Sequence, residues 1–250
     1  MSATSTTVVL GGAGAIGREI AAVLAERGDR VVVADLIGAS ETVASLAGHG
    51  HVGIECDVTD VASVDALLGP AAESYDGVVY AAGTNHTGFL VDTDWAAYDR
   101  LMAVNLRGAF HVGASVSRRL ASGGGPVACV FLASTAGLRG EAGGSIYCAT
   151  KFGLIGLVQS LAAEIARYGA RANAVAPGNI DSPMLRRLAA EVAAREDADP
   201  DELLRRWASA SAFGRLIGTR EVAEACATLL TPSTSGVSGQ TLVVDGPPPA

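Results

Sequence analysis

A tyrosine, a lysine and a serine in this chain have the types and spacing that suit acid–base chemistry. Tyr147 and Lys151 belong to the stretch Ser-Ile-Tyr-Cys-Ala-Thr-Lys, and Ser134 precedes the tyrosine by thirteen residues. Side chains four residues apart leave the same face of a helix. Lowering a phenol pKa from ~10 by about three units requires roughly 4 kcal/mol. One ammonium ~4 Å away in an effective dielectric of ~20 supplies about that much, so the pair suits proton transfer in a partly dry cleft.

The Tyr-x-x-x-Lys spacing alone also fits an exposed pair on a helix, so the surrounding elements must decide between the two interpretations. Short apolar runs alternate with helical patterns along the chain, and no linker or change in composition divides it. Near-continuous apolar strands are typical of a parallel sheet covered on both faces. We therefore predict one doubly wound, Rossmann-type α/β domain over residues 1–250, with about seven parallel strands.

The apolar runs and helical periodicities place the expected elements along the chain. The expected strands are residues 7–10, 30–35, 51–56, 76–81, 127–133, 170–176 and 241–244. The expected helices are residues 16–27, 40–46, 61–68, 94–120, 145–168, 182–211 with an interruption at Pro200, and 220–230. Asp60 or Thr59 is expected to cap the third helix, and Thr219 the last one.

Composition excludes several classes of partner. The chain of 250 residues has a net charge of −8 and a pI near 5.0, which argues against nucleic acid and anionic membranes. Its four cysteines show no paired spacing, and the N-terminus has no secretory pattern, so we expect a cytoplasmic protein with reduced thiols. No window approaches the ~20 apolar residues of a membrane span. His49, His51 and Cys56 lack a second ligand cluster, so no metal is expected.

A glycine turn near the N-terminus predicts a dinucleotide site. An apolar strand ends in residues 11–17, where Gly12, Gly14 and Gly17 fit G-x-G-x-x-G, and a helical pattern follows. This context lets the backbone approach a pyrophosphate at a helix N-terminus. Asp35 ends the next strand 18 residues after Gly17, where a carboxylate would bind an adenosine ribose. An ordinary glycine-rich turn and a strand-end cap are the alternative interpretations. No Arg or Lys directly follows Asp35, which favours NAD over NADP.

Together these motifs give the chain a resemblance to the classical short-chain dehydrogenases/reductases, from Val8 to Gly246. The resemblance implies a catalytic tetrad of Asn105, Ser134, Tyr147 and Lys151. It also implies a set of cofactor-binding residues. These are Gly11, Gly14, Ala15, Ile16, Gly17, Asp35, Asp57, Val58, Ala82, Gly83, Tyr147, Lys151, Pro177, Gly178, Ile180 and Ser182.

The mechanism implied by the resemblance assigns a role to each member of the tetrad. Lys151 would hold the nicotinamide ribose and, with the charge of the oxidised nicotinamide, lower the pKa of Tyr147. Tyr147 would exchange a proton with the substrate oxygen during hydride transfer, and Ser134 would orient that oxygen. Asn105, in the middle of an expected helix, would anchor a water that connects Lys151 to solvent. A satisfied helical amide is the alternative for Asn105.

The chain departs from the family pattern at three places that bear on cofactor binding. The central turn glycine is Ala15, and the Thr that usually follows the Pro-Gly turn is Ser182. The usual Asn-Asn-Ala-Gly reads Tyr80-Ala81-Ala82-Gly83, which removes a side-chain tie near the adenosine side. The chain ends at residues 246–250 in a stiff, proline-rich tail.

The function implied by the resemblance is interconversion of a secondary alcohol and a ketone with NAD. An NADP-using 3-oxoacyl-type ketoreductase, a non-redox cofactor-sensing protein and an epimerase or dehydratase are the alternatives. The apolar helices at residues 107–120 and 150–166 predict a homotetramer or at least a homodimer.

We also expect a lid over the active site. It spans residues 182–213, is mobile without ligand and orders over a mainly apolar substrate. The large apolar residues of this segment are expected to close over the substrate; packing on the lid's own core or on a neighbouring subunit is the alternative for each. They are Met184, Leu185, Leu188, Trp207 and Phe213. A charged substrate group would reach Arg139 or the pair Arg186-Arg187.

Overall fold

The computed structural model describes residues 5–245 and contains one sheet of seven parallel strands. The strand order is β3-β2-β1-β4-β5-β6-β7. The strands are β1 (Thr6–Leu10), β2 (Arg30–Asp35), β3 (Val52–Glu55), β4 (Gly77–Tyr80), β5 (Ala128–Leu132), β6 (Arg171–Pro177) and β7 (Thr241–Val244). This doubly wound arrangement confirms the predicted fold class. Gly246 and the proline-rich tail lie outside the described residues.

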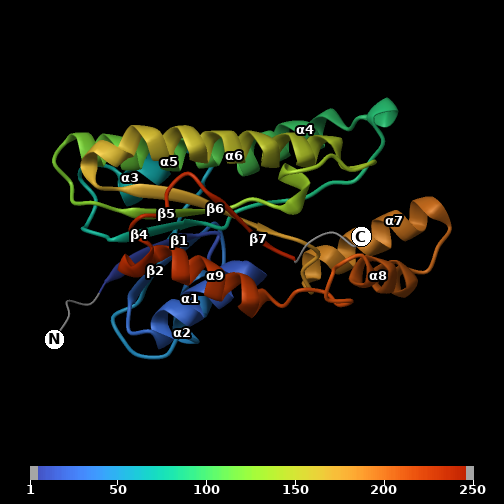
Figure 1. Cartoon of the computed structure of the whole chain (residues 1–250), viewed down its shortest axis with the longest axis horizontal. Coiled ribbons are helices and arrows are strands. Elements are labelled where there is room, and N and C mark those ends of the chain that lie inside the picture. The colour runs from blue at the N-terminus through green and yellow to red at the C-terminus, as the bar shows by residue number, and fades with distance from the viewer. Residues whose placement is uncertain (1–4, 246–250) are drawn as a thin grey trace.

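Helices cover both faces of the sheet (Figure 1). One face carries α3 (Val61–Leu68), α4 (Trp95–Leu101), α5 (Gly108–Ala121) and α6 (Ser145–Ile165). The other carries α1 (Ala15–Glu26), α2 (Ala39–Ala44) and α9 (Thr219–Leu230). Because strand side chains alternate between faces, Val8 and Leu10 enter one buried core while Val9, between them, enters the other.

Helix α6 shows why hydropathy alone does not define a membrane span. Residues Ser145–Tyr168 are long and apolar enough to cross a membrane by length and composition, so the expectation that no such window exists was wrong. Leu154, Val158 and Ile165 of this helix are fully buried in the core formed with the sheet. The apolar composition of α6 is therefore explained by packing in the interior of the domain.

One helix boundary differs from the sequence expectation. Gly218, not Thr219, is the N-cap of α9, and the Glu221 carboxylate accepts the Gly218 N–H at 2.8 Å. The expected interruption at Pro200 is present. Helix α7 (Pro183–Glu196) ends before it, and Pro200 begins α8 (Pro200–Ser209), because proline is favourable in the first helical turn. Of the two caps considered for α3, the structure selects Asp60.

The long helix expected over residues 94–120 contains a wider turn. Met102–Arg107 form a π-helix between α4 and α5. The Tyr80 hydroxyl, at the end of β4, donates a hydrogen bond to the Val104 carbonyl in this turn. Burial raises the pKa of Tyr80, which keeps the donor proton in place. The asparagine side chain that usually forms a hydrogen-bonded link at this position is absent here. The Tyr80 hydroxyl instead links the sheet to the π-turn.

Gly108 leaves the space that the Tyr80 hydroxyl occupies. A Cβ atom at position 108 would lie 2.4 Å from the Tyr80 hydroxyl oxygen and 3.1 Å from the Val58 carbonyl oxygen. Tyr80 is 1% exposed and its ring packs against Phe131 at a centroid distance of 6.0 Å. The position of the Tyr80 hydroxyl therefore requires a residue without a side chain at position 108.

We expect Tyr80→Phe to lower the free energy of unfolding by about 1–3 kcal/mol, because it leaves the Val104 carbonyl without its partner. Urea unfolding measures this change. Tyr98→Phe is the matched control, since the Tyr98 hydroxyl makes no hydrogen bond within residues 5–245 and its loss should cost less than ~0.5 kcal/mol. Equal effects of the two changes would contradict the role of Tyr80.

Candidate active site

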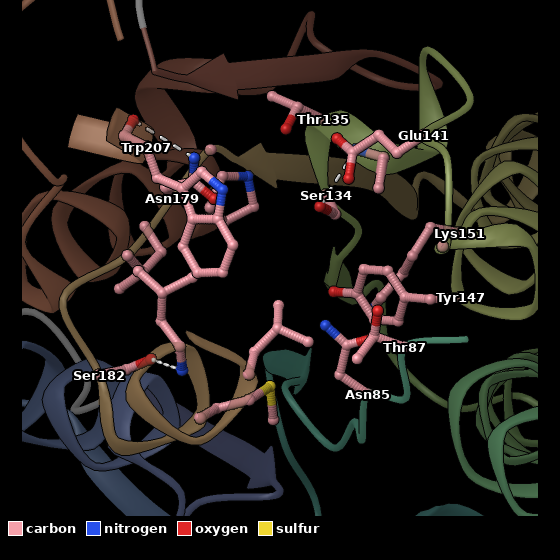
Figure 2. A pocket seen from close by; sticks show the side chains of 18 of the residues that line it. Asn85, Thr87, Ser134, Thr135, Glu141, Tyr147, Lys151, Asn179, Ser182 and Trp207 are labelled. Carbon is pink, nitrogen blue, oxygen red and sulfur yellow. Dashed lines mark hydrogen bonds between the residues drawn. The ribbon is translucent and has the colours of Figure 1, made fainter. Parts of the chain in front are cut away.

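A cavity of about 600 Å³ opens at the carboxyl edge of the sheet. Its walls are the ends of β4, β5 and β6, the first turns of α6, and the lid helices α7 and α8, which lie beyond this edge (Figure 1). Side chains from these distant segments surround one open space, with Ser134 and Tyr147 on one side and Asn179 and Trp207 on the other (Figure 2). This edge is where doubly wound sheets bind their ligands.

Ser134 and Tyr147 lie together in this cavity. Ser134 lies two residues after the end of β5 and caps a short turn, where its Oγ accepts the Ala136 N–H at 3.2 Å. Tyr147 lies in the first turn of α6. Burial raises the pKa of Tyr147 to about 12, while the neighbouring Ser134 hydroxyl acts in the opposite direction and the Glu141 charge raises the pKa further. The Tyr147 phenol is thus protonated at neutral pH.

Lys151 is buried beside the tyrosine, with 4% of its surface exposed. Its Nζ donates to the Leu132 carbonyl at 2.7 Å and lies 5.6 Å from the centre of the Tyr147 ring. Burial lowers the pKa of Lys151 to about 8. The Lys151 ammonium is therefore near the Tyr147 ring and shielded from solvent, and its hydrogen-bond acceptor is the backbone carbonyl at the end of β5. Among the groups of the protein itself, burial dominates the pKa of Tyr147, so its lowering by Lys151 together with an oxidised nicotinamide stays a prediction.

Asn105 joins the π-turn to the loop after β4. Its amide nitrogen donates to the Thr84 carbonyl at 2.9 Å and to the Thr150 hydroxyl at 3.2 Å, and its oxygen accepts the Thr84 N–H at 2.8 Å. A Cβ atom at Gly83 would lie 3.6 Å from the Asn105 oxygen and 3.7 Å from Lys151 Nζ. Asn105 thus orders the floor of the cavity beside Lys151. Its water-holding role stays a prediction.

The glycine turn between β1 and α1 has the shape that a dinucleotide requires. Gly11 adopts a φ of +75°, and a Cβ atom at Gly17 would lie 2.1 Å from the Gly11 carbonyl oxygen. Ala15 is exposed at the start of α1, so its methyl group is accommodated without a clash in the turn. No side-chain cap is bonded to the N-terminus of α1. The cradle therefore fits a pyrophosphate.

Asp35, at the end of β2, stabilises this glycine turn through hydrogen bonds. Its carboxylate accepts the Ala13 N–H at 2.9 Å and the Leu36 N–H at 2.8 Å. The structure also brings a cation to the turn that sequence reasoning missed. The Arg18 guanidinium, on α1, donates to the Ala13 carbonyl at 3.2 Å.

The other expected cofactor residues divide into two groups. Ile16, Gly83, Pro177, Gly178, Ile180 and Ser182 line the cavity together with Ser134, Tyr147 and Lys151. Asp57 and Val58 lie at the end of β3 and form a polar turn, where the Asp57 carboxylate accepts the Thr59 N–H at 2.8 Å and the Val58 carbonyl pairs with His111 at 3.0 Å. Ala82 packs against the core beside α5, outside the cavity wall.

The lid agrees in part with the expectation. Met184, Leu185, Leu188 and Trp207 line the cavity. Phe213 does not, because it is 61% exposed beyond the end of α8, near Arg215. The expectation for the pair Arg186-Arg187 was also wrong, since neither lines the cavity and Arg186 instead pairs with Asp181 at 2.6 Å.

Several polar residues of the cavity carry no recognisable motif, and sequence reasoning missed them. They lie on loops and lid helices that only the folded chain brings together. They are Asn85, His86, Thr87, Glu141, Asn179, Arg195, Glu196 and Arg206. Within residues 5–245, no cluster of three His, Cys, Asp or Glu side chains could hold a metal ion.

The fold and the cavity define a dinucleotide-dependent oxidoreductase with a Rossmann-type domain. Residues 11–246 match the family described as "Enoyl-(Acyl carrier protein) reductase". The chain is 37% identical to cis-4-hydroxycyclohexanecarboxylate dehydrogenase of Sinomonas cyclohexanicum, covering 98% of this chain and 96% of the relative. It is 33% identical to sorbitol dehydrogenase of Cereibacter sphaeroides, covering 96% of each chain.

A solved structure agrees with these sequence relatives. Actinorhodin polyketide ketoreductase with NADPH superimposes with a TM-score of 0.90 at 30% identity, covering 97% of this chain and 96% of the other. The chain belongs to the short-chain dehydrogenase/reductase family.

We expect the Lys151 ammonium to titrate near pH 8, because burial disfavours its charged form. Lys151 is the only lysine in the sequence, so protein labelled with 13C at the lysine Cε carbon gives a single lysine signal. Following this signal from pH 6 to 11 measures the pKa directly, and Lys151→Arg removes the signal as a control. A midpoint above ~10, the ordinary value, would show that the ammonium is solvated.

Proposed function

We propose that the protein is an NAD-dependent oxidoreductase that interconverts a secondary alcohol and a ketone. The observation that carries this proposal is the meeting of Ser134, Tyr147 and Lys151 in one cavity at the carboxyl edge of the sheet. The Ser134 and Tyr147 hydroxyl groups lie on the same side of the open space (Figure 2), and Ser134 is close enough to act against the burial that raises the Tyr147 pKa. Two hydroxyl groups in this arrangement can hold one substrate oxygen between them.

The protonation states support a direct role for Tyr147 in ketone reduction. With a pKa raised to about 12, its phenol is protonated and can donate to the carbonyl oxygen while Ser134 holds that oxygen in place. The nicotinamide cofactor, when bound, supplies the hydride to the carbonyl carbon. For alcohol oxidation the same phenol must first lose its proton, and the nearby Lys151 cation favours that charged form. Asn105 fixes the loop beside Lys151 through its two hydrogen bonds to the Thr84 backbone.

The residues around Asp35 support NAD as the preferred cofactor. The Asp35 carboxylate lies beside the turn and would repel a 2′-phosphate, and its neighbours Leu36 and Ile37 are exposed and apolar. Arg18 is the counter-argument, since a guanidinium could attract that phosphate. However, it is bonded to the backbone of the turn at Ala13. We therefore assign the choice of cofactor to Asp35.

Exposed apolar side chains support a homo-oligomer. Phe110 on α5 and Phe152 on α6 are 51% and 47% exposed, and Leu242 and Val243 lie exposed on the edge strand β7. Such surfaces are usually covered by a partner. We propose a homotetramer or at least a homodimer. All four cysteines are free and buried, which supports a cytoplasmic location.

Replacement of Tyr147 by Phe tests the chemistry. We expect kcat to fall by about 10²–10⁴-fold or more, because the proton donor is lost. Cofactor affinity, measured by isothermal titration with NAD and NADH, should stay within ~3-fold, because the ring remains. Ser134→Ala should lower the rate less, since it removes only an orienting bond. A Tyr147→Phe rate within tenfold of the parent would refute the assignment.

Replacement of Asp35 by Asn tests the cofactor choice. The parent should use NAD at least ~10-fold more efficiently than NADP, because a carboxylate beside a 2′-phosphate is unfavourable. Asp35→Asn keeps an acceptor for the Ala13 N–H but removes the charge, so kcat/KM with NADP should rise. Asp35→Ser with Leu36→Arg should move the preference toward NADP. Arg18→Gln should leave the preference for NAD intact. Equal efficiency of the parent with both cofactors would contradict the proposal.

A further inference from the structure

The cavity is cationic although the protein is acidic. Lys151, Arg139, Arg195 and Arg206 line it, against two carboxylates, Glu141 and Glu196. The chain as a whole has a net charge of −8. Three of the four cations come from the loop after β5 and from the lid, which is the substrate side of the cavity and is far along the chain from the glycine turn. The excess of positive charge is therefore local and needs an explanation.

The arginines of the cavity are not engaged in close ion pairs. Arg195 lies 4.0 Å and Arg206 3.8 Å from the Glu196 carboxylate, which is too far for a hydrogen bond. By contrast, Arg215 forms a two-point pair with Glu221 at 2.7 and 2.8 Å. Arg215, which lies outside the cavity, thus forms a tight pair, whereas Arg195 and Arg206 retain donors for another anion.

Arg195 is held in a defined orientation. Both of its terminal nitrogens donate to the Thr87 hydroxyl at 3.3 Å, and its guanidinium stacks over the Phe89 ring at 5.0 Å. Its side chain is only 29% exposed at the end of α7. Two long bonds to one neutral hydroxyl leave most of the donor capacity of the guanidinium unused. A carboxylate would accept both terminal N–H groups in a fork.

The position of Arg195 relates it to the reacting groups. A Cβ atom at Gly143 would lie 3.6 Å from its Nη2 and 3.5 Å from the Thr87 hydroxyl. Gly143 lies two residues before α6 begins at Ser145 and four residues before Tyr147. The guanidinium therefore lies beside the loop that leads into the first turn of α6, where Tyr147 is found. It can receive a group several bonds away from the substrate carbonyl.

We propose that the substrate is a hydroxy acid or keto acid, with a carboxylate that Arg195 binds, assisted by Arg206, while its alcohol or ketone lies between Ser134 and Tyr147. This inference rests on the proposed alcohol–ketone chemistry and names its substrate class. Because Arg195 contacts Thr87 beside Gly143, two residues before α6, the proposal places the carboxylate several bonds away from the reacting carbon. Thr87 and Phe89 act as positioning residues that hold the guanidinium toward the cavity.

Matched acid and amide substrates test the proposal by turnover. The parent enzyme should reduce 5-oxohexanoate at least ~10-fold more efficiently than the neutral 5-oxohexanamide, because only the acid can form the fork. Arg195→Gln should raise KM for the acid by ~10-fold or more and leave the amide within ~2-fold. Arg206→Gln should weaken acid use less. Arg205→Gln is the matched control, because Arg205 adjoins Arg206 but does not line the cavity, and it should change neither substrate.

Binding of an unreactive acid separates this inference from the proposed reaction. The chain has two tryptophans, so in Trp95→Phe the fluorescence reports on Trp207 in the cavity wall. Hexanoate should quench or shift this fluorescence and hexanamide should not, and Arg195→Gln should remove the response to hexanoate. If hexanoate binds in this way but no ketone is reduced, the proposed function fails and the carboxylate site stands.

Two results would overturn the carboxylate site. The first is equal use of 5-oxohexanoate and its amide by the parent, together with no hexanoate response. The second is an equal loss of both substrates in Arg195→Gln, which would indicate a structural role. Arg195→Lys keeps the positive charge but removes the two-point contact with a carboxylate. If Arg195→Gln folds poorly, this variant therefore distinguishes a carboxylate-binding role of Arg195 from a structural one. It should retain an intermediate preference for the acid.

Discussion

The buried Lys151 ammonium is the interaction on which the site depends. A cation with 4% of its surface exposed is unfavourable in the protein interior unless it is bonded, and here it donates to the Leu132 carbonyl at the end of β5. That bond fixes α6 against the sheet at the level of Ser134, two residues further along the chain. The position of Tyr147, one turn earlier on the same helix, follows from it. One backbone carbonyl therefore aligns the members of the site that come from β5 and α6.

A second set of bonds holds the opposite wall. Tyr80 at the end of β4 bonds to Val104 in the π-turn, and Asn105, the next residue, bonds to both backbone groups of Thr84. A π-turn disrupts the regular bonding of a helix, and such turns are common at functional sites. The hydrogen bonds of the Tyr80 and Asn105 side chains compensate for the disrupted backbone bonding of the π-turn. The loop after β4, which carries Thr87 toward the lid, thus begins from a rigid base.

The lid is built differently from the domain that it covers. Helices α7 and α8 share a small core of their own, in which Val192, Ala193 and Leu203 are buried with Leu188 and Trp207 packed against them. Trp207 and Leu188 also line the cavity, so one set of side chains stabilises the lid and forms part of the cavity wall. Ordering of the lid over a substrate stays a prediction.

The sequence determined the fold class, the order of the elements and the residues that we propose for proton transfer. Strand periodicity, the glycine turn and the spacing of Ser134, Tyr147 and Lys151 are local signals that tertiary contacts do not reverse. The tertiary structure alone decided the protonation states, because burial raises the Tyr147 pKa and lowers that of Lys151. It also decided which arginines line the cavity. Arg195 and Arg206 were missed and Arg186-Arg187 misplaced, because the direction of a side chain on a lid helix depends on how that helix packs, which no local pattern encodes.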